Sequence, residues 1–202
     1  MALDTTHPSK FSTPLIDKHV LRDALGTFAT GVTIVTTLSP SGEPIGFTAN
    51  SFTSVSLDPP LILVCIAKSA AGYAIYNAAS TYCVNILAQT QRDLSGIFAA
   101  RGADKFGGIS WRKGETGSPI LDGGVAHFDC AMHETVDAGD HAILIGRVVE
   151  FKTNDGEPLC YHRGKYAALA QAYTTPANYV SARASEPPHL IQTHIQQMGD
   201  PS

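Results

Sequence analysis

Two strand-like runs in the second half of the chain constrain its fold more than any other feature. They are residues 123–138 (GGVAHFDCAMHETVDA) and 141–153 (HAILIGRVVEFKT), and only Gly139 and Asp140 separate them. Two such runs joined by a short, glycine-containing turn predict a long β-hairpin. Antiparallel pairing is therefore expected to dominate the fold.

The remaining segments predict further strands. Runs rich in β-formers indicate strands at 32–38, 46–61, 61–67 and 81–88, and a shorter hairpin at 157–169 around Arg163–Gly164. These strands do not alternate strictly with helices, so a doubly wound parallel sheet is disfavoured. The pattern favours a mainly β fold with peripheral helices, built as a closed or partly closed antiparallel barrel.

Three helices are expected between these strands. The first lies within 16–31, with Asp17 as its N-cap and Gly31 as its end. The second covers 68–80, so that Lys68 stands at a helix start. The third covers 90–102, where Thr90 and Asp93 resemble a capping box and Gly102 ends the helix. Residues 103–119 are expected to form a long loop that is functional or contacts a partner.

Composition limits the classes of function. The 202 residues are 44% hydrophobic, enough for one compact domain with a sizeable core. A formal net charge of -4 disfavours a nucleic-acid surface, and no polybasic run suggests a membrane surface. Only 16% of the residues are charged, against roughly 25% in an average soluble domain. This low value suggests that a second subunit covers part of the surface.

The sequence also predicts a cytoplasmic location. The segment MALDTTHPSK has neither the basic nor the apolar region of a signal peptide. No apolar run reaches the roughly 20 residues that span a bilayer. The four cysteines include no C-x-x-C pair, so we expect reduced thiols. The expected organisation is an N-terminal arm at 1–17, one domain at 18–170 and a C-terminal tail at 171–202, which contains a possible short helix.

Several catalytic motifs are missing from the sequence. It has no G-x-G-x-x-G after a strand, no Walker A run, no H-E-x-x-H and no G-x-S-x-G elbow. The eight histidines are not paired at metal-ligand spacing, so no metal site is predicted. If the chain is an enzyme, the expected design is a bound cofactor that the protein holds and tunes.

The segment GFTANSFTSVSLDPPL at 46–61 carries small hydroxylated side chains in place of core residues. Strand periodicity places Thr48 and Asn50 on one face, with Ser54 on the same face if no bulge intervenes. Short side chains suit a flat ligand close to the backbone, and the cations of Lys68, Arg101 and Lys105 suit its phosphate. The alternative is a solvated edge strand flanked by solvated cations.

Two other segments each have two interpretations. His141 follows the Gly-Asp turn, either as a turn histidine bonded to Asp140 or as a histidine that projects into a redox site. Tyr161 and Tyr166 flank the Arg163–Gly164 turn, either as a cross-strand aromatic pair or as an anchor for an anionic or aromatic ligand. Trp111, the only tryptophan, fits either packing or stacking.

Six segments in order resemble one known family, the split-barrel flavin reductases. They are LRDALGTFATGVTIVTT, GFTANSFTSVSLDPPLILVCIAKSA, FAARGADKFGG, LDGGVAHFDC, AGDHAILIGRV and PLCYHRGKY. The resemblance covers about residues 18–170. It implies a homodimer of six-stranded antiparallel split β-barrels of Greek-key type, with flavin bound near the dimer interface. Members of the family are the small reductase partners of two-component flavin-dependent monooxygenases.

The same resemblance implies an activity and a site. The activity is hydride transfer from NADH or NADPH to FMN or FAD, and reduced flavin then passes to a separate oxygenase. A non-catalytic flavin carrier or sensor is the alternative. His141 is the implied catalytic residue, beside the nicotinamide. The implied cofactor-binding residues are Gly46, Phe47, Thr48, Ala49, Asn50, Ser51, Ser54, Ala67, Lys68, Ser69, Arg101, Lys105, Phe106, His141 and Tyr166.

Overall fold

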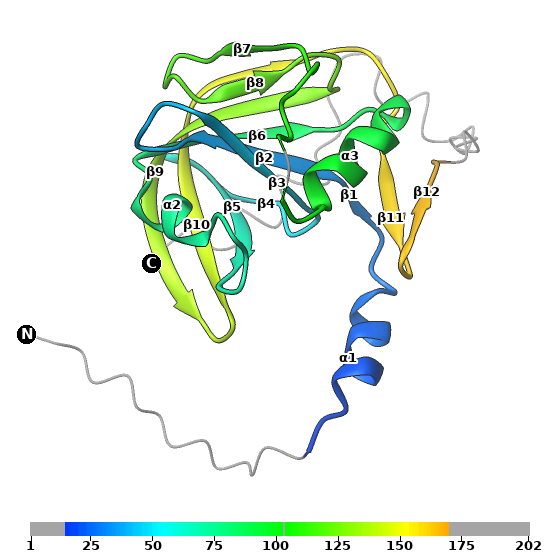
Figure 1. Cartoon of the computed structure of the whole chain (residues 1–202). Coiled ribbons are helices and arrows are strands. Elements are labelled where there is room, and N and C mark those ends of the chain that lie inside the picture. Colours follow the sequence, from blue (N-terminus) through cyan, green and yellow to red (C-terminus); the bar gives the residue numbers. More distant parts are fainter. Residues whose placement is uncertain (1–14, 103, 170–202) are drawn as a thin grey trace, which may run out of the picture.

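The computed structural model describes residues 15–102 and 104–169 (Figure 1). The C-terminal tail expected at 171–202, with its possible short helix, lies outside the described residues, as does nearly all of the expected arm at 1–17. Within the described ranges, no helix is long and apolar enough to cross a membrane.

The predicted mainly β, antiparallel architecture is confirmed. Seven strands form the main sheet in the order β3-β2-β6-β9-β10-β5-β4, and every neighbouring pair is antiparallel. The expectation was six strands. The strands of this sheet are β2 (Thr33–Leu38), β3 (Pro44–Ala49), β4 (Thr53–Leu57), β5 (Pro60–Ala67), β6 (Thr81–Ile86), β9 (Ala126–Ala138) and β10 (His141–Thr153).

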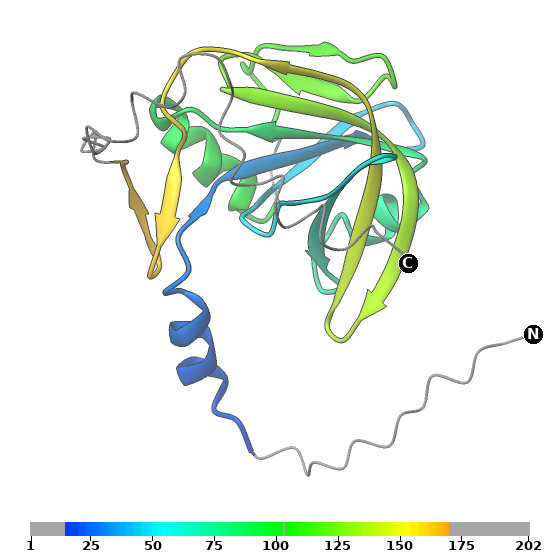
Figure 2. The same cartoon turned by 180° about the vertical axis from the view of Figure 1, so that it is seen from behind.

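Two small sheets flank the main one. The first joins β1 (Thr30–Gly31) to the hairpin of β11 (Cys160–His162) and β12 (Lys165–Ala167). The second is the hairpin of β7 (Trp111–Lys113) and β8 (Pro119–Leu121), which lies within the segment expected to be a loop. Figure 2 shows both from behind. The predicted turn at Arg163–Gly164 is confirmed, and both residues have positive φ.

The long hairpin predicted at 123–153 is present, and its two strands lie inside the main sheet. β9 and β10 pair along their whole length, from His141 opposite Ala138 to Thr153 opposite Ala126. β10 also pairs with β5, and there the first partners are His141 and Ala67. The Gly139–Asp140 turn therefore extends beyond the end of β5. His141 stands where the turn, β10 and β5 meet.

The segment at 46–61 is not one strand. β3 ends at Ala49, residues 50–52 have no strand structure, and β4 begins at Thr53. β3 and β4 then lie at opposite ends of the strand order. The period-2 argument that placed Ser54 on the face of Thr48 was therefore wrong, because the chain leaves one edge of the sheet and returns at the other. β composition alone did not reveal this break.

Helix α1 (Lys18–Leu25) is shorter than predicted and buries none of its side chains among the described residues. Its N-cap is Asp17 as predicted, and Asp17 Oδ1 accepts hydrogen bonds from the backbone N–H groups of His19 and Val20. The C-cap is Gly26 and not Gly31. In both views α1 projects from the body on the same side as the β9–β10 turn (Figures 1 and 2).

The other two helices also differ from expectation. α2 (Tyr73–Ala78) begins five residues after Lys68, because residues 68–72 form a turn. Lys68 is therefore not at a helix start, and the predicted contribution of a helix dipole there was wrong. α3 (Arg92–Ala99) follows the short 3-10 helix η1 (Gln89–Gln91).

The cap of the third helix is also not the predicted one. The Gln91 side chain, rather than Thr90 with Asp93, makes the capping contact, because its Oε1 accepts from the N–H of Ala88. The helix itself ends at Ala99, before Gly102.

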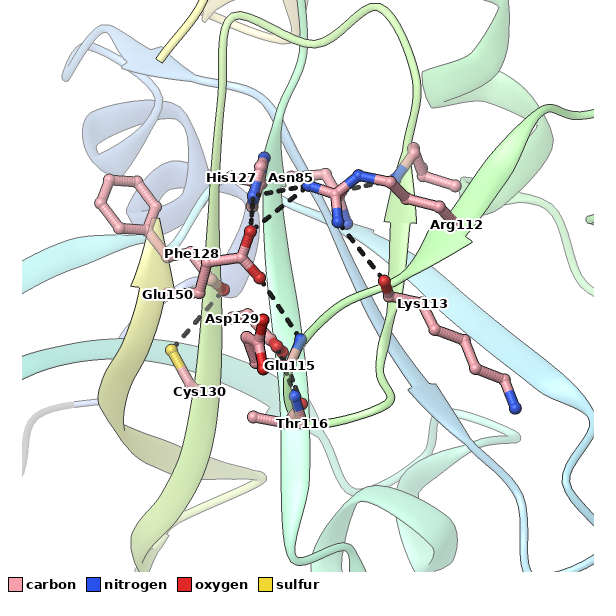
Figure 3. A network of polar contacts seen from close by, with 11 residues as sticks. Asn85, Arg112, Lys113, Glu115, Thr116, His127, Phe128, Asp129, Cys130 and Glu150 are labelled. Carbon is pink, nitrogen blue, oxygen red and sulfur yellow. Dashed lines mark hydrogen bonds and ion pairs between the residues drawn. The ribbon is translucent and has the colours of Figure 1, made fainter. Parts of the chain in front are cut away.

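The β7–β8 hairpin is held to the main sheet by a polar network (Figure 3). Asp129 on β9 is completely buried and accepts hydrogen bonds from the backbone N–H and the hydroxyl of Thr116. Glu150 on β10 accepts from the N–H of Glu115 and pairs with Arg112 at 3.4 Å. Burial acts to raise the pKa of Glu150, but hydrogen bonds from Glu115, His127 and Arg112 together outweigh it and keep the pKa below its ordinary value.

Candidate functional site

A cavity of about 730 Å³ lies between β3, the end of β5, α2, the end of α3 and the start of β10. Twelve of the fifteen residues predicted for the site line it, and Ser54, Lys68 and Tyr166 do not. The twelve are Gly46, Phe47, Thr48, Ala49, Asn50, Ser51, Ala67, Ser69, Arg101, Lys105, Phe106 and His141.

The wall formed by β3 depends on a glycine. A Cβ atom on Gly46 would lie 2.5 Å from Cε1 of Phe98 on α3, so only glycine lets the helix pack this close. Thr48 makes a second contact, because its hydroxyl donates to the carbonyl of Ser95 at 2.7 Å. Ser95 in turn shares a hydrogen bond of 2.9 Å with the hydroxyl of Tyr166. Tyr166 therefore lies behind the wall and supports α3.

The segment after β3 is also held by its own side chains. The Ser51 hydroxyl accepts a hydrogen bond of 2.9 Å from the N–H of Cys65 and donates to the same residue's carbonyl at 3.3 Å. This pair ties the bend after β3 to β5 at Cys65, where β10 is the only strand partner among the described residues. Thus two hydroxyls predicted as ligand contacts, those of Thr48 and Ser51, also position the backbone that lines the cavity.

The floor of the cavity is aromatic. The Phe47 ring meets the Tyr76 ring edge-on, with centroids 4.9 Å apart. Tyr76 is buried, and its hydroxyl donates to the carbonyl of Val35 at 2.8 Å and lies 3.3 Å from that of Ile45. Burial raises the pKa of Tyr76 well above its ordinary value, so the phenol stays protonated.

One end of the cavity is cationic. The Lys105 ammonium donates to the carbonyls of Phe98 at 2.8 Å and of Gly46 at 3.3 Å, and partial burial lowers the pKa of this lysine. Arg101 is exposed beside it. The Asp104 carboxylate accepts from the N–H groups of Phe106 and Gly107, both at 3.0 Å. This cap fixes the turn at 104–107, which carries Lys105.

His141 lines the cavity at the tip of the long hairpin. Its Nδ1 lies 2.7 Å from Oδ1 of Asp140. His141 therefore makes the predicted contact with Asp140 and also lines the cavity. The hydrogen bond from His141 keeps the pKa of Asp140 below its ordinary value. Because an ionised carboxylate can only accept, Nδ1 is the donor of this hydrogen bond, and in that tautomer Nε2 is the acceptor atom of the imidazole.

Lys68 and Ser54 lie away from the cavity for different reasons. The Lys68 side chain turns to the β9–β10 hairpin, where its ammonium pairs with Asp137 at 2.8 Å. Ser54 belongs to β4 at the far edge of the main sheet.

A family model for the flavin reductase like domain matches residues 25–170 of this chain. This chain belongs to the flavin reductase family. A probable flavin reductase of Rhizobium meliloti strain 1021 is 50% identical over 152 residues, which are 75% of this chain and 49% of that protein. The reductase component of the flavin-dependent trigonelline monooxygenase of Acinetobacter baylyi is 51% identical over 154 residues, 76% of this chain and 50% of that protein. The chain thus spans about half the length of these two relatives.

A solved structure of a similar protein shares the fold. The NADH:FAD oxidoreductase SgcE6 of Streptomyces globisporus C-1027, in complex with NAD and FAD fragments, is 38% identical and superposes with a TM-score of 0.73. The match covers 80% of this chain and 99% of that one.

The cavity of this flavin reductase family member has the features that a flavin requires. A flat ring needs small side chains beside the backbone, and Gly46, Ala49 and Ala67 provide them. A ribityl phosphate needs cations, and Arg101 and Lys105 lie at one end. The volume of about 730 Å³ lies within the range of cofactor sites, roughly 300–1,000 Å³.

Sequence reasoning missed the residues that α2, the turn before it and α3 add to the lining. They are apolar or small, and among them are Ala70, Ile75, Tyr76, Phe98 and Ala99. The run Ala70–Ala71–Gly72 was a usable signal, because three small residues after a buried strand let a ligand approach the backbone. Phe98 and Tyr76 carried no such signal, since a buried aromatic residue on a helix usually indicates core packing.

Proposed function

We propose that this protein is an NAD(P)H:flavin oxidoreductase that reduces FMN or FAD and supplies reduced flavin to a separate monooxygenase. The observation that carries the proposal is the cavity itself, with cations at one end and His141 in the wall, in a chain of the flavin reductase family. The names of the relatives support it, because one is a monooxygenase reductase component and another is an NADH:FAD oxidoreductase with NAD and FAD fragments bound.

The residues that line the cavity have separate tasks in this proposal. Gly46 and Ala49 leave room for the flavin ring, and Arg101 with Lys105 bind its phosphate. When bound, the flavin supplies the redox chemistry by taking up the hydride that NADH or NADPH gives up. His141 positions the nicotinamide through Nε2, and Asp140 holds the imidazole in the required tautomer. The protein thus contributes binding and orientation, and no side chain acts as a nucleophile.

The experiment that tests this function is steady-state oxidation of NADH and of NADPH with FMN or FAD. We expect nucleotide oxidation that depends on added flavin, with one nucleotide preferred. Oxidation of neither nucleotide with either flavin would exclude the reductase and favour a flavin carrier or sensor. Initial rates over both substrates separate a ping-pong mechanism with bound flavin from a sequential one with flavin as substrate.

We also infer a homodimer of split barrels, in which a second copy covers α1. The side chains of Val20, Leu25 and Phe28 are 66%, 67% and 76% exposed, which is unusual for large apolar residues that are neighbours. A second cavity of about 800 Å³ lies beside α1, and Asn50 lines both cavities. A partner seated there would reach the edge of the flavin site. The cytoplasmic location stays a prediction from the sequence.

Sedimentation equilibrium tests the dimer. The chain has a mass of 21.4 kDa, and we expect a species of twice that mass. The substitution Leu25→Glu on α1 should shift the protein towards the monomer, because it would bury a charge in the interface. Ile97→Glu is the matched control, since Ile97 is an exposed apolar residue on α3. A monomeric parent protein, or equal dissociation of both variants, would contradict the inference.

A further inference from the structure

Among the residues that the structure describes, the polar contacts of the Lys68 side chain are all with the tip of the β9–β10 hairpin. Its ammonium donates to both carboxylate oxygens of Asp137 at 2.8 Å and to the carbonyl of Gly139 at 2.7 Å. Its backbone N–H donates to the carbonyl of Asp140 at 2.9 Å. An ammonium has three donors, so these contacts use every one of them.

The segment that Lys68 holds is the one that carries His141. β5 ends at Ala67, opposite His141, so the turn at 139–140 lies beyond the last residue pair of β5 and β10. Lys68 is the next residue of the chain and bridges this end. It contacts three successive parts of the turn, namely the end of β9, the glycine and the aspartate that pairs with His141.

The same contacts argue against a role of Lys68 in binding phosphate. A phosphate ligand needs a free donor, and the carboxylate of Asp137 already neutralises the charge of the lysine. The lysine also lies outside the cavity lining, whereas Arg101 and Lys105 lie within it. The ion pair itself is partly exposed, with 33% of the Lys68 side chain and 79% of the Asp137 side chain accessible. Such a pair contributes little to the free energy of unfolding, so its main effect is to fix the position of the turn.

We propose that Lys68, with Asp137, is a positioning residue that orients the Asp140–His141 pair towards the nicotinamide and takes no part in flavin binding. The proposal rests on the role of His141 in the proposed function. Loss of the lysine side chain removes the contacts to Asp137 and Gly139 and leaves only the backbone hydrogen bond from residue 68 to Asp140 across this end, and the imidazole then samples orientations that do not meet the substrate. A displacement of this kind lowers the reaction rate without a change in the flavin site.

The test compares Lys68→Met, Asp137→Asn and the double variant in the full chain. We expect each single variant to lower kcat by about 10-fold and the double variant to be no slower, because both remove the same contact. The Kd of FMN and of riboflavin, measured by flavin fluorescence, should stay within about two-fold. Lys165→Met is the control, since Lys165 is an exposed lysine on the β11–β12 hairpin.

A second comparison uses the His141→Ala background. If Lys68 acts through His141, Lys68→Met should lower kcat no further once the imidazole is gone. An additional loss of about 10-fold in that background would overturn the proposal.

The rival role of Lys68 gives a different pattern. A phosphate ligand would lose affinity for FMN but not for riboflavin in Lys68→Met, and Asp137→Asn would leave FMN affinity unchanged or raised. This pattern overturns the proposal. If His141→Ala slows turnover and the two single variants do not, the Lys68 proposal alone fails. If His141→Ala has no effect, the role of His141 in the proposed function fails.

Discussion

The His141→Ala variant is expected to reduce kcat by about 100-fold and to change the flavin Kd by no more than about three-fold. The reason is the position of the ring, which lines the cavity and is oriented by Asp140 through a 2.7 Å hydrogen bond. In the proposed function, its loss removes the acceptor that orients the nicotinamide, while the residues of β3 and the cations proposed to bind flavin stay in place. Stopped-flow reduction of bound flavin, with a separate flavin titration, measures the two quantities.

His133→Ala is the matched control for this variant. His133 is an exposed histidine on β9, the strand that pairs with the one carrying His141, and it does not belong to the cavity lining. We expect parental turnover from it. A loss of flavin affinity in His141→Ala much larger than the loss of turnover would assign His141 to flavin binding and contradict the prediction.

The Asp129→Ala variant is expected to lower the free energy of unfolding by about 3 kcal/mol. Asp129 is completely buried and accepts hydrogen bonds from the backbone N–H and the hydroxyl of Thr116 (Figure 3). Removal of the carboxylate leaves the Thr116 N–H without its acceptor and the Thr116 hydroxyl with only that of Ser118, and it detaches the loop between β7 and β8 from β9. Urea or guanidinium unfolding, followed by circular dichroism, measures the change.

Two further variants separate the hydrogen bonds from general effects of substitution. Asp129→Asn keeps the shape and one acceptor, so we expect roughly half of the loss. Asp155→Ala removes an exposed carboxylate from the loop after β10 and should change stability by less than about 0.5 kcal/mol. Equal stability of Asp129→Ala and the parent protein would show that Thr116 finds other partners and would refute this account of the hairpin.

Local patterns predicted the two hairpins at 123–153 and 157–169 and their turns well. The β9–β10 hairpin, its Gly-Asp turn and the Arg163–Gly164 turn all follow from residues within a few positions of one another. The same is true of the Asp17 N-cap. These features depend on backbone conformations and short-range hydrogen bonds, which residue type largely decides.

Features that depend on distant partners were predicted less well. The break after Ala49 and the late start of α2 at Tyr73 have no clear signal in composition. The partner of Lys68 is Asp137, which is 69 positions away in the sequence. Because nothing in the sequence indicated this partner, Lys68 was predicted to stand at a helix start and to contact a ligand. In each case a tertiary contact outweighs a local preference.

The candidate site shows the same difference between local patterns and contacts between residues that are distant in the sequence. The sequence by itself determined which residue types are available, namely the small side chains of the 46–51 segment, the cations at 101 and 105, and a histidine after a tight turn. Only the tertiary structure decided which of them share a cavity, because β5, α3 and the long hairpin bring together segments that are far apart in the chain. The tertiary structure also separated the residues that line the cavity from those that hold the surrounding fold in place. A hydroxyl or an ammonium serves a ligand or the fold according to the partner within hydrogen-bond distance, and that partner is set by packing and not by residue type.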